Sequence, residues 1–240
     1  MKGIILQPTY LPWLGYFEMI NSSDIFIIFD HVQFERKSWQ NRNKIKTASG
    51  QAYLTVPIQK SPQDTPIYKI KISYQQDRQG NPLEKHWKTI SLAYKKSPSF
   101  DKYKQFFEKI YYKKYILLRD LNVDLIKLIC DILGIKTRIV LSSELNLKDD
   151  NMGKTEKVIN LCKKQGIDIL YDAKGAEEFL DKNLFEKENI KIIFQNFQCK
   201  EYPQLWGKFI PYLSTIDLIF NQGEKSLSII KSGTEANPQC

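Results

Sequence analysis

The stretch from Arg36 to Lys46 holds the densest group of side chains suited to ligand chemistry in this sequence. It reads RKSWQNRNKIK, in which five cations surround one tryptophan and three amides. Cationic side chains can hold a pyrophosphate, amides can read hydroxyls or a base edge, and an indole can stack on a sugar or a base. The alternative is a solvated basic loop, and no glycine-rich phosphate loop is present, so side chains would have to bind the phosphates. We predict that the ligand-binding residues here are Arg36, Trp39, Asn41, Arg42, Asn43 and Lys44.

His31 is one of two histidines and directly follows Asp30, at the end of an apolar run. An imidazole at this point could accept a proton from an attacking amine while the carboxylate of Asp30 sets its tautomer. Neighbouring residues of a strand point to opposite faces, so this pairing requires the strand to have ended before Asp30. The second histidine, His86, lies on a predicted helix and is a candidate for substrate binding. For each histidine the alternative is a structural role.

Further candidates for substrate binding lie near predicted strand ends. Gln7 stands between an apolar run and Pro8, a position that packing explains poorly. The remaining candidates are Tyr10, Gln33 and Lys174, the last in a D-A-K-G loop whose glycine allows close backbone approach. Trp13 is expected to belong to a hydrophobic wall. The SSE motif at 142–144 lacks a G-x-S-x-G elbow, so a helix-capping turn is favoured there over a nucleophile.

The elements that must position these side chains form a βαβ unit. Apolar runs at 4–6 and 25–29 are short and rich in β-branched and aromatic residues, which predicts buried strands, and 14–21 is a predicted helix. Strands connected in this way are parallel, and ligands bind outside the carboxyl ends of parallel strands. We therefore expect one cleft bordered by Gln7, Tyr10, Asp30, His31, Gln33 and residues 41–43.

The rest of the chain continues the α/β alternation. Strands are predicted at 136–141, 167–171 and 190–194, and helices at 115–133, 152–166, 176–183 and 215–221. Residues 51–59 and 68–73 are predicted to pair as antiparallel strands outside the parallel sheet. Helices at 83–94 and 100–112 belong to a helical insert, 75–134, that could act as a lid. The fold class is therefore α/β, a mostly parallel Rossmann-like sheet with a helical insert, in a single domain at 1–231 with a flexible tail at 232–240.

Composition excludes several classes of protein. No run approaches the ~18 apolar residues of a membrane helix and no signal-peptide pattern opens the chain, so we expect a cytoplasmic protein without stable membrane insertion. The four cysteines are scattered without a C-x-x-C motif, which indicates reduced thiols, and we expect neither a metal nor a cofactor. The net charge of +9 would attract the phosphates of nucleotide sugars, RNA or a membrane surface. The alternative is a lysine-rich solvated surface.

Several motifs resemble the WbqC-like family of bacterial proteins. QPTYLPWLGYFEMI, FDHVQF and SWQNRNKIK carry most of this likeness, and LTVPI, HWKTISLAY, SSEL, YDAKGAEEFL and LSTIDLIFNQG extend it over most of the chain. Members are often found in gene clusters for O-antigen, part of lipopolysaccharide, and for other surface polysaccharides. Some are described as glycine or aminoacyl transferases that act on amino sugars. The resemblance transfers no catalytic residue.

The resemblance implies a glycine-type acyl or aminoacyl transferase that forms an amide on a nucleotide-linked amino sugar in O-antigen biosynthesis. His31 or Asp30 could act as the base and Arg42 or Asn43 could stabilise the oxyanion, while aminoacyl-tRNA or an acyl thioester would suit as the donor. The alternatives are a non-catalytic protein that binds a nucleotide sugar or phosphoglycan, and an RNA-contacting protein. The element order also resembles nucleotidyltransferase-like Rossmann folds such as that of pantothenate synthetase. Their H-x-G-H motif is Trp13-Leu14-Gly15-Tyr16 here, and without its histidines adenylyl transfer is rejected.

Overall fold

The computed structural model describes residues 1–75, 80–147 and 152–234. Its centre is a five-stranded parallel sheet with the strand order β5-β2-β1-β6-β7. This arrangement confirms the Rossmann-like α/β class that the alternation of apolar runs predicts. The strands are β1 (Lys2–Leu6), β2 (Ile25–Ile28), β5 (Arg138–Leu141), β6 (Ile169–Asp172) and β7 (Lys191–Phe194).

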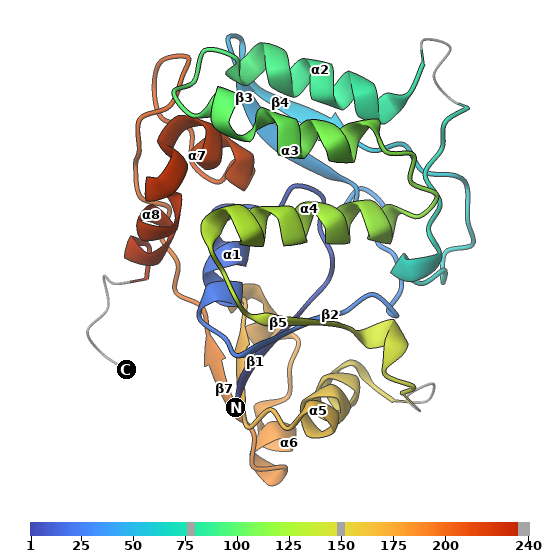
Figure 1. Ribbon diagram of the computed structural model, residues 1–240. Coiled ribbons are helices and arrows are strands. Elements are labelled where there is room, and N and C mark those ends of the chain that lie inside the picture. The colour runs from blue at the N-terminus through green and yellow to red at the C-terminus, as the bar shows by residue number, and fades with distance from the viewer. Residues whose placement is uncertain (76–79, 148–151, 235–240) are drawn as a thin grey trace.

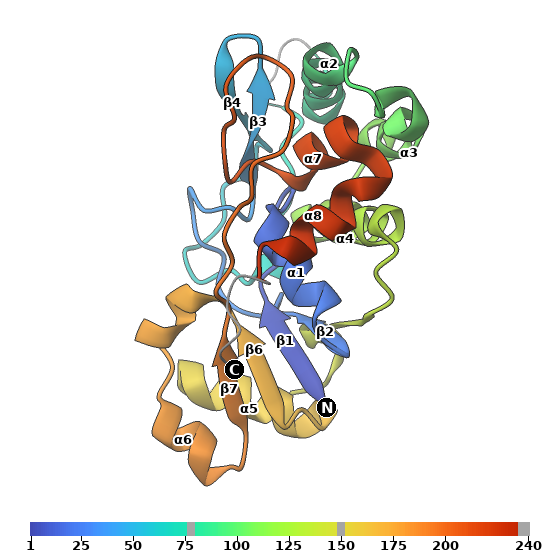
Figure 2. The same ribbon diagram turned by 90° about the vertical axis from the view of Figure 1, so that its left-hand side faces the viewer.

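The strand order reverses beside β1. The chain passes from β1 to β2 and β5 on one side, and then returns to β6 and β7 on the other side of β1. Ligands of open parallel sheets bind outside the carboxyl ends of the strands, where such a reversal leaves a crevice between neighbouring loops. The carboxyl ends point toward the half of the molecule that holds the antiparallel hairpin of β3 (Arg42–Thr47) and β4 (Gly50–Thr55), as Figure 2 shows.

Different helices cover the two faces of the sheet, because alternate residues of each strand point in opposite directions. Ile5, Ile25 and Ile27 pack with α5 (Lys154–Gln165) and α6 (Lys182–Lys187). The opposite face, which includes Ile4 and Phe26, packs with α1 (Leu14–Asn21) and α4 (Leu118–Leu133). Figure 1 shows the resulting layers, with α5 and α6 below the sheet and α1 and α4 above it.

A helical layer lies beyond α4 and packs against one side of the hairpin. It consists of α2 (Pro82–Tyr94), α3 (Phe100–Tyr112), α7 (Thr215–Gln222) and α8 (Ser226–Ser232) (Figure 1). Buried residues of these helices belong to the same hydrophobic cluster as one face of the sheet. A role of segment 75–134 as a lid stays a prediction, and residues 235–240 of the predicted tail lie outside the described residues.

Helix ends follow the glycines as expected. Gly134 closes α4 with φ of 74° and Gly166 closes α5 with φ of 68°, a left-handed conformation that costs glycine little. Among the described residues there are also four short 3₁₀ turns: η1 (Ile67–Lys69), η2 (Ser142–Glu144), η3 (Lys174–Glu178) and η4 (Gly223–Lys225).

Three elements differ from the sequence prediction. The NRNKIK stretch, for which no strand is predicted, is largely strand β3, because β4 pairs with it residue by residue from Arg42–Thr55 to Thr47–Gly50. Segment 68–73 makes only isolated bridges, one of them between Ile58 and Ile72, so the predicted antiparallel pairing of 51–59 with 68–73 is wrong in extent. The helix predicted at 176–183 is divided between η3 and α6, with Asp181 capping α6 through its side chain.

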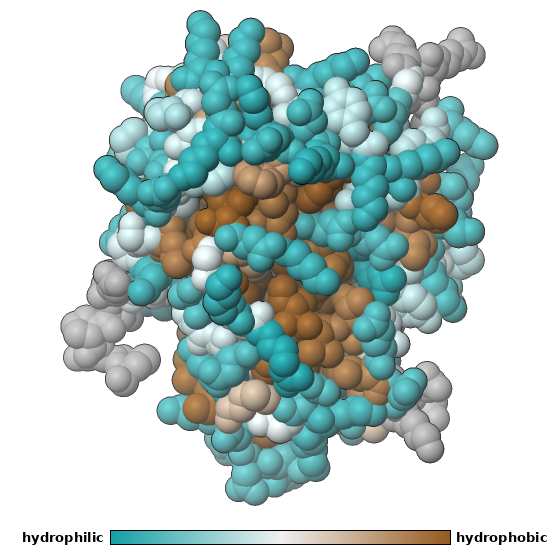
Figure 3. All heavy atoms as spheres, viewed as in Figure 1, coloured by the Kyte–Doolittle hydropathy of each residue, from teal (hydrophilic) through white to brown (hydrophobic). Residues whose placement is uncertain are grey.

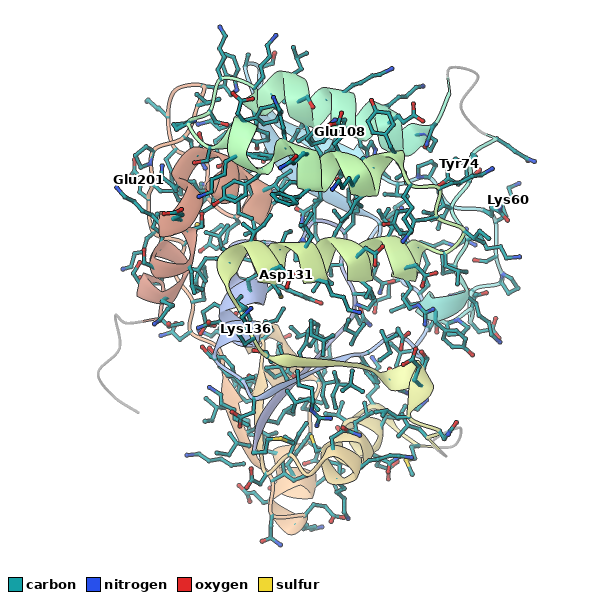
Figure 4. All side chains as sticks on the ribbon, viewed as in Figure 1. Lys60, Tyr74, Glu108, Asp131, Lys136 and Glu201 are labelled. Atoms are coloured by element: carbon teal, nitrogen blue, oxygen red, sulfur yellow. The ribbon has the colours of Figure 1, made fainter. Side chains whose placement is uncertain are left out.

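Strand β5 forms one edge of the sheet and leaves apolar side chains partly exposed. Ile139, Val140 and Leu141 are half-buried, and Figure 3 shows an apolar area at the level of β5 below α4. At the end of α4, Asp131 and Lys136 border this region (Figure 4). None of the helices among the described residues is long and apolar enough to cross a membrane.

Candidate functional site

The loops that follow the parallel strands bring polar side chains to the carboxyl edge of the sheet. Gln7 follows β1, Asp30 and His31 come shortly after β2, and Ser142 follows β5. The register pairs Leu6 with Ile28 and Ile28 with Leu141, so the ends of these three strands are level. Residues more than 110 positions apart in the chain therefore meet at this edge.

Asp30 is the centre of a buried hydrogen-bond network. Its carboxylate is inaccessible to solvent, and Oδ1 accepts bonds from the Ser142 hydroxyl at 3.0 Å and the Ser143 backbone N–H at 2.9 Å. Oδ2 accepts bonds from the Ser143 hydroxyl at 2.7 Å and from Nη1 of Arg119 at 3.2 Å. A buried carboxylate needs such compensation, because each lost partner would leave a charge without solvation.

Ser142 connects this carboxylate to His31. Its hydroxyl oxygen lies 2.6 Å from Nδ1 of His31, accepts the backbone N–H of Asp30 at 3.0 Å, and donates to Oδ1 of Asp30. A hydroxyl has one proton and two acceptor lone pairs. Because the proton points to the carboxylate and one lone pair receives the Asp30 N–H, the second lone pair must receive a proton from Nδ1. The network therefore holds His31 with a proton on Nδ1.

The predicted contact of Asp30 with His31 is thus corrected in its geometry. The carboxylate acts on the imidazole through the Ser142 hydroxyl. The ring of His31 packs edge-on against Phe29 at 5.0 Å between centroids, and the histidine is half-buried. This packing and the Ser142 contact together fix the orientation of the ring.

Arg119 supplies the positive charge of the network. Burial alone would lower its pKa, but the hydrogen bond to Asp30 and the interactions with Asp120 outweigh burial and raise it. The side chain retains 18% exposure and borders an open hollow of about 370 Å³. Tyr74 lies near the start of α4 (Figure 4), and its hydroxyl donates to the carbonyl of Tyr115, which lines this hollow. The hollow is lined by Lys113, Lys114, Tyr115, Ile116, Arg119, Asp120, Val123, Asp124 and Leu141.

A second cavity, here called the aromatic cavity, is lined by residues of two sequence motifs, QPTYLPWLGY and SWQNRNKIK. It has a volume of about 260 Å³ and is lined by Thr9, Trp13, Tyr16, Trp39, Asn43, Lys44 and Tyr212. Trp13 packs against Tyr212 at 5.7 Å between ring centroids, and the Lys44 ammonium lies 5.8 Å from the Trp39 ring centre. The hydroxyl oxygen of Thr9 is buried without a hydrogen-bond partner. Aromatic walls with a cation and a few polar atoms suit a planar, anionic ligand.

The asparagines of SWQNRNKIK, here called the basic motif, donate hydrogen bonds to backbone carbonyls of neighbouring segments. Asn43 donates to the carbonyl of Leu11 at 2.7 Å, and Asn41 donates to the carbonyl of Val56 at 3.0 Å. Both asparagines are buried, although Asn43 still lines the aromatic cavity. Gln7 accepts a bond from Nε2 of Gln40 at 2.8 Å, which ties the loop after β1 to the motif. These contacts bring the two motifs together as the sequence predicts.

Tyr10 and His86 have a structural role in this arrangement. The Tyr10 hydroxyl lies 2.8 Å from Nδ1 of His86 and 2.8 Å from the Tyr111 hydroxyl, in the core. Tyr10 is fully buried, so the structure contradicts the prediction that it borders the cleft. Burial lowers the pKa of His86 to about 4, which keeps its ring neutral, and a hydrogen bond to the backbone of Thr55 opposes this shift.

Other predicted residues lie apart from the aromatic cavity. Gln33 and Arg36 line a different hollow of about 530 Å³ with Phe34, Glu35 and Gln63, and Arg36 donates to the carbonyl of Ser61. Arg42 is directed at the ring of Tyr53 on the hairpin. Lys174 is exposed in η3, after β6.

Sequence reasoning missed Ser142, Ser143 and Arg119 as members of the site. The serines follow a predicted strand, and that position alone could have placed them at the carboxyl edge. Arg119 carries no local signal, since its contact with Asp30 spans 89 residues. Asp172 was treated only as part of a loop, yet burial raises its pKa to about 6 at the end of β6. Within the described residues no cluster of histidine, cysteine and acidic side chains could hold a metal ion.

Comparison with known proteins gives two matches. Residues 7–229 match the model of the WbqC-like protein family. An uncharacterized protein of Mycobacterium tuberculosis is 33% identical over 233 residues, which cover 94% of this chain and 95% of that protein. No solved structure gives a significant match.

Proposed function

The chain belongs to the WbqC-like protein family, and we propose that it is a transferase that forms an amide on a nucleotide-linked amino sugar. The acyl group would be of the glycine or aminoacyl type, delivered as an activated ester or thioester, in the cytoplasmic synthesis of a surface polysaccharide such as O-antigen. The substrate class follows from the resemblance of the sequence motifs to this family. The reaction is assigned to the carboxyl edge of the sheet, because ligands of open parallel sheets bind there.

The reaction requires one base and one leaving group. The amine nitrogen of the sugar attacks the acyl carbon, a C–N bond forms, and the bond from that carbon to the donor oxygen or sulfur breaks. The amine loses a proton to the base, and the leaving oxygen or sulfur gains one. A positioned base contributes roughly a hundredfold or more to such a step.

The observation that carries the proposal is the His31–Ser142–Asp30 arrangement. Its hydrogen bonds place a proton on Nδ1, so Nε2 is the nitrogen that would act as the general base. Arg119 and the Ser143 groups hold the buried Asp30 carboxyl group in place, so that Ser142 cannot turn its proton toward the imidazole at low cost.

The aromatic cavity supports the substrate class. Trp13, Trp39 and Tyr212 provide planar walls for a base or sugar ring, and Lys44 provides a cation for a phosphate. Its volume of about 260 Å³ is suited to a part of a nucleotide sugar, not to the whole molecule. The cavity would therefore anchor one end of the substrate while the rest extends along the carboxyl edge.

Two substitutions separate binding from chemistry. His31→Ala should leave substrate affinity within about twofold and lower single-turnover rates by roughly a hundredfold or more. Lys44→Ala should weaken binding by about tenfold, through loss of a charged contact worth about 1.5–3 kcal/mol when fully formed. Lys88→Ala, which removes an exposed lysine from α2, is the matched control.

The assay combines calorimetry with mass spectrometry of the product. The purified protein is incubated with a panel of nucleotide-linked amino sugars and with aminoacyl-tRNA or acyl thioester donors. Amide formation that depends on His31 would support the proposal. Binding that depends on Lys44 without turnover for any donor would overturn the transferase and favour a protein that only binds nucleotide sugars.

A further inference from the structure

The segment from Arg36 to Gln63 contains six lysines and arginines and no acidic residue. It includes the whole β3–β4 hairpin. One of its cations, Lys46, is buried and donates to the carbonyl of Lys208 at 2.6 Å, so it is unavailable to a ligand. The other five are at least partly exposed, and Lys60 lies at the periphery of the molecule (Figure 4).

The outer face of the hairpin presents two large aromatic rings. Trp39 is 47% exposed and Tyr53 is 54% exposed, and the two rings lie side by side on this face. Their centroids lie 6.4 Å apart and their planes differ by 21°, so the rings present nearly parallel faces. In the hairpin register Tyr53 is directly opposite Lys44, and Arg42 is opposite Thr55.

Cations flank these rings without competing anions. The guanidinium carbon of Arg42 lies 5.4 Å from the Tyr53 ring centre, and the Lys44 ammonium lies 5.8 Å from that of Trp39. No ion pair between described residues uses a cation of segment 36–63, whereas elsewhere lysines such as Lys163 and Lys182 pair with glutamates. Nε of Arg42 is itself buried without a hydrogen-bond partner, so only the outer part of its guanidinium can reach a ligand.

We propose that this outer face binds single-stranded nucleic acid, with bases stacked on Trp39 and Tyr53 and phosphates held by Arg42 and Lys44. Nearly parallel exposed rings bordered by cations are the arrangement that single strands require, because every base has a π-face and every linkage carries a negative charge. A duplex hides the faces of its bases, and its phosphates alone would not use the rings. The exposed neighbours Gln51 and Thr55 are polar, which disfavours insertion into a lipid surface.

The face borders the aromatic cavity, since Trp39 and Lys44 also line that cavity. A strand that ends on the hairpin would therefore bring its terminus beside the aromatic cavity. Nucleic-acid affinity is measured without turnover, so this test does not depend on the proposed transfer reaction. Tyr53 lies outside the lining of the aromatic cavity, and its substitution tests this face separately.

The test uses the full chain and a fluorescent 12-nucleotide single-stranded RNA, with anisotropy as the readout. Tyr53→Ala should weaken binding by at least about fivefold, the lower limit for the loss of one base–aromatic stack. Tyr112→Ala, which removes a tyrosine that is 52% exposed on α3, is the matched control and should change affinity by less than about twofold. Arg42→Gln should reduce the salt dependence of binding by about one phosphate contact, whereas Arg138→Gln should not.

Several results would overturn the proposal. Equal losses for Tyr53→Ala and Tyr112→Ala would show that the rings are not used. Equal affinity for a 12-base-pair duplex or for heparin would leave only a basic surface. Loss of nucleotide-sugar binding in Tyr53→Ala would show that the hairpin face and the aromatic cavity are one site. A parallel single-stranded DNA probe distinguishes RNA from DNA, and anionic vesicles that bind in a Tyr53-dependent manner would point to a membrane instead.

Discussion

Replacement of Ser142 by alanine should change the tautomer of His31. The substitution removes a hydroxyl that donates to Asp30, accepts the Asp30 backbone N–H, and contacts Nδ1 of His31 at 2.6 Å. Without that acceptor nothing in this contact holds the proton on Nδ1. The neutral ring should then become a mixture of both tautomers. Because Ser142 does not contact substrate in the proposed site, its role is to position the base.

The energetic cost follows from the three contacts. Ser142 is 1% exposed, so water does not compensate for the lost bonds. A hydrogen bond to a charged group contributes about 1.5–3 kcal/mol, and a buried donor without a partner costs about 1–3 kcal/mol. These terms overlap, and we expect Ser142→Ala to lower the free energy of unfolding by about 2–4 kcal/mol. Turnover should fall by roughly tenfold or more, a part of what a positioned base contributes.

The assay is nitrogen NMR of protein labelled only at histidine, which gives two imidazoles because the chain has two histidines. At pH 8.5 an unperturbed imidazole is neutral, so the spectra report tautomers. His31 should carry its proton on Nδ1. His86 should carry its proton on Nε2, because it donates to the backbone of Thr55 and its Nδ1 faces the Tyr10 hydroxyl.

A matched control separates tautomer from stability. Ser22→Ala removes another serine–carboxylate bond, the 2.8 Å contact with Glu18, and should leave both histidine spectra unchanged. In Ser142→Ala the spectrum of His86 is an internal control for folding. A wild-type His31 with its proton on Nε2, or a His31 spectrum that Ser142→Ala does not alter, would refute the assignment of the network.

Three further predictions concern stability and are checked by urea unfolding. Burial raises the pKa of Asp172 in the folded protein to about 6, so its contribution to stability falls as the pH rises from about 4 to 6. Asp172→Asn should therefore stabilise the protein at pH 7.5 by up to about 3 kcal/mol, and should not stabilise it at pH 4. Burial lowers the pKa of His86, so stability should be lost as the pH falls from about 6.5 to 4. A His86→Gln variant whose free energy of unfolding changes with pH as much as that of the wild type would contradict this. Gly134→Ala should cost about 1 kcal/mol at any pH because φ is 74°, and an unchanged unfolding midpoint would exclude strain there.

The fold was largely predictable because its signals are local. Helix α1 is predicted at its observed bounds, and the apolar runs of β1 and β2 predict a parallel pair whose ends lie at one edge. The hairpin was not predictable in the same way, because β3 is a polar strand: Arg42 and Lys44 face outward while Lys46 is buried under a distant loop. A solvated loop was the alternative for this stretch, and the pairing with β4 makes it a strand instead.

The candidate site was predictable only in part. The positions of Gln7, Asp30 and His31 after buried strands place them at the carboxyl edge from sequence alone. Burial of Tyr10 and His86 could not be predicted, because aromatic and histidine side chains occur both in cores and in clefts. The aromatic cavity needed Tyr212, which reaches the first helix from the far end of the chain.

The sequence by itself determined which segments are strands and helices, since hydrophobic periodicity and helix-ending glycines act over a few residues. Through the parallel crossover it also determined where the basic motif and Asp30 lie relative to the sheet. Only the tertiary structure decided the chemistry of that edge. Ser142 and Arg119 reach Asp30 across 112 and 89 residues, and these contacts fix the proton of His31. A hydrogen bond at that separation depends on the packing of β5 and α4 against β2, which no local pattern of residues encodes.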